Sequence, residues 1–284
     1  MSDSVEPSTP PPIPVPEPAP EPEVKPFYAA DADFPKGFWH SVDYLLQHPE
    51  LVLNSIVHEH DLWRLKGTFL VVTIAMGMIY GVVMGATNLL QGTEMALFGK
   101  FAMMPITAIK VTTLLLLTLV IVIPPIYVSN SFVGSRFSFK QLVVLLLAGC
   151  AVTSTVLASM ATVAFFFALT STSYYFIKLL HVLFFAYAGF MGLRFVLATF
   201  SAVAKATGKR LDYSLLIMWI VLYAFVGTQL AWVMRPFIGR SDMPVTLFRP
   251  REGNFYENLL DSADKMMTGA QQQKGKRANP ARND

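Results

Sequence analysis

Acidic side chains are missing from the long central part of this chain. No aspartate or glutamate occurs between Met95 and Leu211, although lysines, arginines and one histidine are present there. Transport coupled to protons or cations, and most metal chemistry, usually depends on a carboxylate in the interior of a membrane protein. This absence therefore argues against ion-coupled transport and against a metal site.

Cysteine and charge are also scarce. Cys150 is the single cysteine, so the sequence predicts no internal disulfide and no cysteine-pair metal site. Charged residues make up 14% of the chain, compared with about 25% in soluble domains. The net charge of +3 is small and comes mostly from loops and tails. It favours contact with anionic lipid headgroups over contact with nucleic acid.

Motifs for catalysis and nucleotide binding are absent as well. The sequence contains no nucleophile elbow, no phosphate-binding loop and no dinucleotide fingerprint. His58-Glu59-His60 resembles a fragment of a metal site, but histidines two positions apart diverge on a helix. We therefore expect no enzymatic activity, no cofactor and no bound metal.

Five long apolar segments dominate what is present. They cover residues 68–90, 111–128, 142–169, 179–203 and 213–233. The first has 23 residues, which is about 34 Å of helix and enough to cross a hydrocarbon core of about 30 Å. The polar connections between segments are short, which predicts antiparallel neighbours. The predicted fold class is all-α, a polytopic membrane helix bundle of about five transmembrane helices.

The remaining regions predict two tails and a juxtamembrane segment. Residues 1–26 contain ten prolines and should form an extended, disordered tail, either a spacer or a ligand for a proline-recognising partner. Residues 27–67 contain two short amphipathic helical patterns, expected at the membrane surface or against the bundle. The transmembrane domain should cover 68–234. Residues 235–284 form a basic tail that we expect to be disordered from Gly269 onward and to offer a second surface for protein partners.

The distribution of basic residues in the loops predicts the orientation. Lysines and arginines are more frequent in the loops on the amino-terminal side, which marks that side as cytoplasmic. Five spans then place the carboxyl-terminal tail on the opposite side. Four arginines close to the last span conflict with that placement: Arg235, Arg240, Arg249 and Arg251.

Two features of the spans predict helix packing and a helix break. Gly77, Gly81 and Gly85 follow one another at intervals of four, which makes a groove for another helix of the same chain or, as an alternative, for a homo-oligomer. Pro124 and Pro125 should end the second span, with a gating hinge as the alternative. Four hydroxyl residues of the third span, Thr153, Ser154, Thr155 and Ser159, are expected to bond backbone carbonyls or neighbouring helices.

Four basic side chains lie at or within the spans and are candidate contacts for an anionic lipid or ligand: Lys110, Lys178, His181 and Arg194. Charge at bilayer depth costs about 2.5–3.5 kcal/mol on insertion scales, so each needs a partner, water or a headgroup. Lys178 and His181 are one turn apart and share a helix face. Gln229 is the candidate hydrogen-bond partner for Arg194.

The layout over about 38–233 resembles the Yip domain family, the Ypt/Rab-interacting membrane proteins and their bacterial relatives. The matching residues are Leu46-Gln47-His48-Pro49-Glu50, Tyr80-Gly81 and Pro124-Pro125-Ile126-Tyr127-Val128. The resemblance implies a cytoplasmic amino-terminal region, five spans, a bacterial cytoplasmic membrane and a non-enzymatic role in membrane organisation or trafficking. The long arginine-bearing tail departs from the family pattern.

These observations favour a non-catalytic membrane scaffold or adaptor that recruits partners through its tails. The alternatives are a channel or transporter for a neutral or anionic solute, and an integral subunit of a larger membrane complex. A continuous polar path through the bundle is the feature that would distinguish transport from scaffolding, because a transporter needs one and a scaffold does not.

Overall fold

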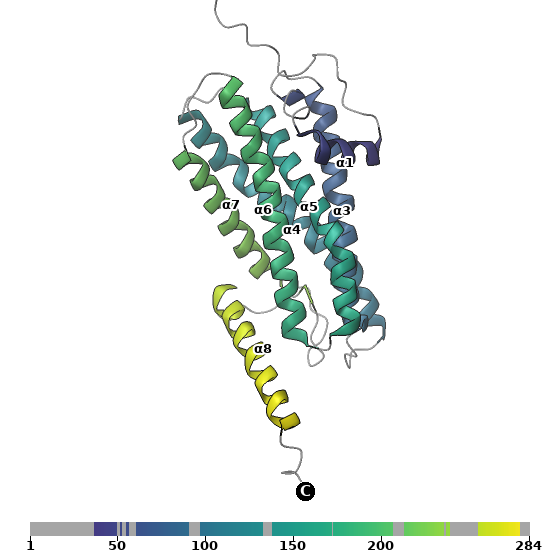
Figure 1. The fold of residues 1–284 in the computed structure, drawn as a ribbon. Helices are drawn as coiled ribbons and strands as arrows, with labels where there is room; N and C mark the ends of the chain where they lie inside the picture. Colours follow the sequence, from purple (N-terminus) through teal and green to yellow (C-terminus); the bar gives the residue numbers. More distant parts are fainter. Residues whose placement is uncertain are drawn as a thin grey trace, which may run out of the picture.

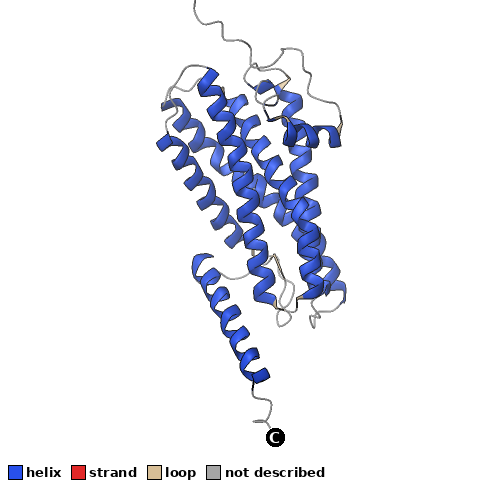
Figure 2. Ribbon diagram, viewed as in Figure 1, coloured by secondary structure: helices blue, strands red, loops and turns tan. Residues whose placement is uncertain are grey.

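The computed structural model of this chain is helical throughout the part that it describes (Figure 1, Figure 2). It describes residues 37–49, 52, 55–56, 61–90, 97–132, 138–171, 173–206, 213–235, 237–238 and 255–278. The proline-rich segment 1–26 and the triplet 58–60 lie outside these residues. The helices are α1 (Phe38–Gln47), α3 (Leu62–Leu90), α4 (Leu97–Phe132), α5 (Phe139–Thr170), α6 (Tyr174–Ala206), α7 (Tyr213–Val233) and α8 (Phe255–Ala278).

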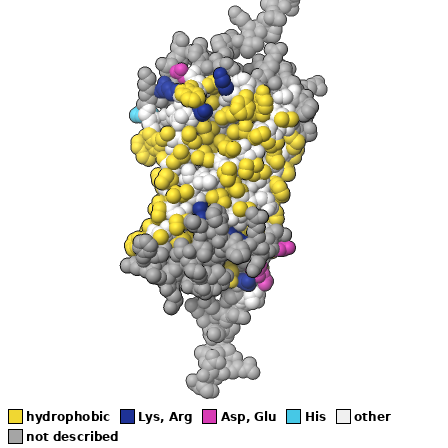
Figure 3. Space-filling view, turned by 180° about the vertical axis from the view of Figure 1, so that it is seen from behind, with side chains coloured by type: hydrophobic (Ala, Val, Ile, Leu, Met, Phe, Trp, Pro, Cys, Tyr) yellow, Lys and Arg dark blue, Asp and Glu magenta, His cyan; other side chains and the backbone are white. Residues whose placement is uncertain are grey.

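The chain is an integral membrane protein with several spans. Helices α3, α4, α5 and α6 are long and apolar enough to cross a membrane, and α7 is a shorter apolar helix of 21 residues. Hydrophobic side chains cover the middle of the face shown in Figure 3, with basic side chains toward both ends of it. The predicted helical bundle is thereby confirmed.

Most span boundaries extend beyond the apolar segments of the sequence. The fifth segment, 213–233, coincides with α7, whereas α3 begins at Leu62 and α6 begins at Tyr174. Hydropathy places a boundary where apolar residues end, but a helix continues as long as its backbone hydrogen bonds do. Residues that we assigned to loops, Lys178 among them, therefore lie on helices.

The prediction that Pro124 and Pro125 end the second span is wrong. Helix α4 is 36 residues long, contains Pro105, Pro124 and Pro125, and continues to Phe132. Proline is tolerated in membrane helices because neighbouring helices and hydroxyl side chains satisfy the freed carbonyls. The carbonyls that lose their helical donor here are those of Val120 and Ile121, four residues before each proline, yet the helix continues past both prolines and Ile126 stays buried in the bundle.

Helix α5 is the most buried of the four long spans and packs against α3, α4 and α6, and α3 packs against both α4 and α5. Helix α6 packs on the outer side of α5, and α7 packs on α4. A capping box starts α5: Ser138 Oγ accepts from the amide of Gln141, and Gln141 Oε1 accepts from the amide of Ser138. The Gln141 amide group also donates to the carbonyl of Ile56 at 3.0 Å, which ties the juxtamembrane region to the bundle.

Helices α1 and α8 lie at opposite ends of the bundle (Figure 1). Helix α1 buries Ser41, Val42 and Leu45 and contacts α3 and α5. Helix α8 contacts α6 and α7 at the other end, which we call the far end. The five helices α3 to α7 run alternately along the bundle in opposite directions, so the chain leaves α7 at the end opposite to α1.

The prediction of a disordered tail from Gly269 onward is wrong for residues 269–278, because α8 continues to Ala278, and residues 279–284 lie outside the described part of the chain. Apolar residues spaced four and seven positions apart, namely Phe255, Leu259 and Met266, allow α8 to be helical while partly burying one side. Ser262, in the middle of the helix, is almost completely buried. The tail therefore contributes an ordered element to the far end.

Candidate functional site

The glycine face of α3 is filled by α4 of the same chain. A Cβ atom at Gly81 would lie 2.4 Å from the Cα of Ala108, and one at Gly85 would lie 2.7 Å from the Cα of Met104. At Gly77 the nearest atom is Thr112 Oγ1 at 3.1 Å. The predicted groove is therefore occupied within the chain, and a homodimer through these glycines would require α3 to separate from α4.

A second close crossing joins α5 and α6, and the sequence analysis missed it. A Cβ atom at Gly192 would lie 2.0 Å from Thr153 Oγ1 and 2.6 Å from the carbonyl oxygen of Gly149. Gly149 and Gly192 stand on different helices, 43 positions apart, so no sequence pattern links the two. The signal available was one small-xxx-small pair in each span, Gly149 with Thr153 and Ala188 with Gly192.

His181 is buried and bonded to Tyr80 of α3. Its Nδ1 lies 2.6 Å from the hydroxyl oxygen of Tyr80, and the two side chains are 2% and 0% exposed. Phe184 and Phe185 pack edge-on against this pair. The Nε2 atom of His181 is buried without a hydrogen-bond partner. His181 therefore faces the interior and does not reach a lipid headgroup, contrary to the prediction.

Lys110 also lies inside the bundle. The prediction placed it at a helix end, but it is 13 positions after the start of α4 and only 5% exposed. The chain after α7 folds over this part of the far end: Ile238 is buried, and the Phe237 carbonyl accepts from Thr107 Oγ1 at 2.9 Å. The Nζ of Lys110 lies 5.9 Å from the centroid of the Phe237 ring. This covering segment removes Lys110 from the lipid surface.

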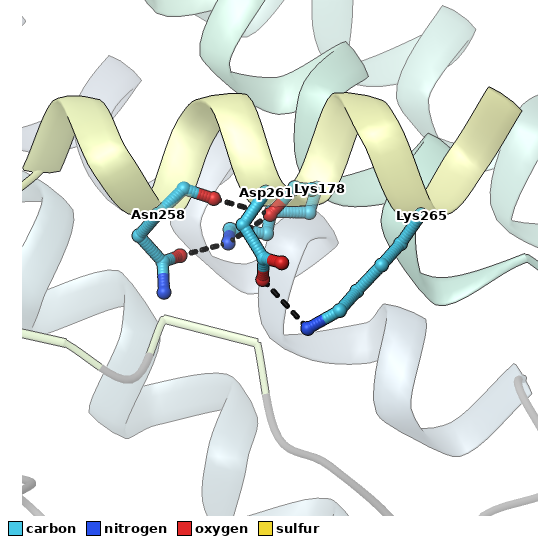
Figure 4. Close-up of polar contacts among 5 residues, drawn as sticks. Lys178, Asn258, Asp261 and Lys265 are labelled. Atoms are coloured by element: carbon cyan, nitrogen blue, oxygen red, sulfur yellow. Dashed lines mark hydrogen bonds and ion pairs between the residues drawn. The ribbon is translucent and has the colours of Figure 1, made fainter. Parts of the chain in front are cut away.

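Lys178 binds α8 (Figure 4). Its ammonium group donates to the side-chain oxygen of Asn258 and to Ser262 Oγ, the latter at 2.6 Å. Ser262 in turn donates to the carbonyl of Asn258. Lys265 and Asp261 form a separate, half-exposed ion pair within α8 at 2.6 Å. Lys178 thus anchors the carboxyl-terminal helix to α6, a partner that the sequence analysis did not predict.

Arg194 alone among the four basic candidates is exposed on the outside of its span. The expected hydrogen bond to Gln229 is not formed, although both residues lie in described parts of α6 and α7. The four basic candidates therefore have three different surroundings. Lys110 and His181 lie in the interior, Lys178 anchors α8, and Arg194 faces outward.

The hydroxyl groups of α5 bond to carbonyls of their own helix, as predicted. Thr153 donates to Gly149, Ser154 and Thr155 donate to Ala151, and Ser159 donates to Val156, at 2.7–3.0 Å. Such bonds satisfy a hydroxyl inside a membrane without a partner on another helix. In the described part of the chain, no group of three histidine, cysteine, aspartate or glutamate side chains could hold a metal ion.

No protein-family model, curated protein or solved structure matches this chain. The resemblance to the Yip domain family stays a prediction.

Proposed function

We propose that this protein is a non-catalytic integral membrane scaffold or adaptor with a role in membrane organisation or trafficking. The observation that carries the proposal is that each end of the bundle holds a folded helix outside the spans. Helix α1 is held by buried Val42 and Leu45, and α8 is held by Lys178. Both leave large apolar side chains exposed for a partner: Trp39 and Leu46 on α1, and Tyr256, Leu260 and Met267 on α8.

The packing inside the bundle supports the proposed role as a scaffold. Buried hydroxyls bond mostly within their own helices, and the crossings at Gly81 and Gly192 bring backbones into close contact. Close backbone packing favours one rigid arrangement of the spans. A rigid bundle would hold α1 and α8 at a fixed separation across the membrane.

Transport of a neutral or anionic solute is the second candidate. It is favoured by two basic side chains in the interior of the transmembrane domain, Lys110 and His181. Basic groups at bilayer depth often mark a substrate pathway. Membership of a larger membrane complex is compatible with the first proposal, because α6 exposes large apolar residues along its length, among them Leu183 and Phe190.

The proposed location is a bacterial cytoplasmic membrane with the α1 end in the cytoplasm. Support comes from the basic loop residues on the amino-terminal side and from the Yip-like layout. The proline-rich tail would then be available to cytoplasmic partners. A homo-oligomer, if formed, would use a surface other than the glycines of α3.

Site-directed photo-crosslinking in intact cells tests the proposal. A photoreactive amino acid is placed at Trp39 and, separately, at Leu260, with exposed Val221 of α7 as the lipid-facing control. We expect defined protein adducts from both ends and no protein adduct from Val221. Absence of protein adducts from both ends would contradict the adaptor role. Gradient-driven solute uptake by the purified protein in liposomes would favour the transporter instead.

A further inference from the structure

Helix α6 carries a continuous exposed ridge. Leu183, Tyr187, Phe190 and Arg194 follow one another at intervals of four, three and four, so they lie on one face. The three apolar members are 62%, 45% and 54% exposed, and Arg194 is exposed as well. Helix α6 packs mainly on α5 and α8, and the exposure of these four side chains shows that the α6 ridge stays uncovered by the described residues.

The position of Arg194 in the span is unfavourable without a counter-ion. The apolar segment of α6 that contains Arg194 continues to Val203, nine residues later, so the Arg194 backbone lies about 13.5 Å inside that end. Side chains on a helix incline toward its amino terminus. The amino terminus of α6 is at the far end, so the Arg194 side chain starts out toward the membrane centre and away from the nearer surface. A phosphate has to sit below the general headgroup plane to meet it.

A second copy of the chain does not supply the anion. The five helices α3 to α7 contain no aspartate or glutamate. A phospholipid phosphate fits better, because the planar guanidinium donates two parallel hydrogen bonds to phosphate oxygens. Lys205, Lys209 and Arg210 follow in the sequence just after the span, so the local charge favours an anionic lipid over a zwitterionic one.

We propose that Arg194 binds the phosphate of an anionic phospholipid whose acyl chain lies along the α6 ridge. The lipid belongs to the leaflet on the α1 side, and Leu183, Tyr187 and Phe190 form the apolar bed for its chain. This is a retained lipid, held below the headgroup plane, and it differs from a general attraction of the protein surface to anionic membranes. The proposal does not depend on the adaptor function.

Native mass spectrometry of the full-length protein tests it, with phosphatidylglycerol titrated into the detergent solution. We expect one retained phosphatidylglycerol in the wild type and affinity weaker by about tenfold in Arg194→Gln, as for loss of a charged hydrogen bond. Arg194→Lys, which keeps the charge but not the planar fork, should be intermediate. Arg64→Gln, which removes a charge near the same surface from α3, is the matched control and should bind like the wild type.

A second measurement uses the wild type and does not depend on the folding of any variant. Photoreactive phosphatidylglycerol in liposomes should label the peptide containing 183–194, and inorganic phosphate should not prevent the labelling. Equal affinity of Arg194→Gln and wild type, equal weakening by Arg64→Gln, or labelling that avoids α6 would each overturn the proposal. If the α6 ridge forms a crosslink to a protein and not to the lipid, the proposal of a bound lipid is also overturned.

Discussion

Glycine residues decide how closely the spans of this protein pack, because the side chain of glycine is a single hydrogen atom. Gly81→Ala should destabilise the bundle by about 1–3 kcal/mol, since the new Cβ meets a backbone atom that cannot rotate away. Gly189→Ala is the matched control, because a Cβ there has no neighbour within 4 Å. Thermal unfolding in mild detergent measures the difference. Equal melting temperatures for the two variants would show that α3 and α4 separate easily.

The buried Tyr80–His181 pair joins α3 to α6 by one hydrogen bond in an apolar setting. Tyr80→Phe should cost about 1 kcal/mol, because it removes the bond and leaves His181 unsatisfied. His181→Leu should cost a similar amount by leaving the Tyr80 hydroxyl unsatisfied. The double variant should lose less stability than the sum of the two, since both polar groups are gone. Unfolding temperatures that add up independently would contradict a direct bond.

At the scale of elements, the hydrogen bonds of Lys178 are the strongest polar link between α6 and α8. Lys178→Met should increase amide hydrogen exchange of 255–268 by about tenfold, because a charged hydrogen bond to Asn258 and Ser262 is lost. Asp261→Asn removes only a half-exposed ion pair within α8, which contributes about 0.3–0.5 kcal/mol. Exchange in that control should change by about twofold or less. Unchanged protection in Lys178→Met would mean that apolar contacts alone hold α8.

At the scale of the whole molecule, α1 and α8 lie at opposite ends of the bundle (Figure 1), and we predict that α3 to α7 all cross the membrane and place α1 and α8 on opposite sides. Cysteines at Asp43 and at Asp264, both exposed, should therefore differ in labelling by an impermeant thiol reagent in intact cells. A Cys150→Ser background removes the native thiol, which is buried in any case. Labelling at Asp264→Cys and protection at Asp43→Cys would support a cytoplasmic amino terminus. Equal labelling of both positions would contradict the five-span topology.

Hydrophobicity by itself determined the class of this protein. The apolar segments of the sequence correspond to α3 to α7, and 213–233 agrees with α7 at both ends. Such agreement has a simple cause: in a membrane every backbone polar group must be satisfied within its own segment, so a long apolar run becomes a helix. The behaviour of Thr153, Ser154, Thr155 and Ser159 was predictable for the same reason, because it is local to one helix.

Only the tertiary structure decided what the polar side chains do. The sequence does not distinguish the basic residues Lys110, Lys178, His181 and Arg194 from one another. In the structure, Lys110 lies under the segment after α7 and Lys178 binds α8. His181 is bonded to Tyr80, and Arg194 faces outward. The partners are about 80 to 130 positions away, as in the bonds of Lys178 to Asn258 and Thr107 to Phe237. Helical periodicity reports the face of a residue only relative to its own helix. Which neighbour covers that face depends on how the helices pack, and that is a property of the whole bundle.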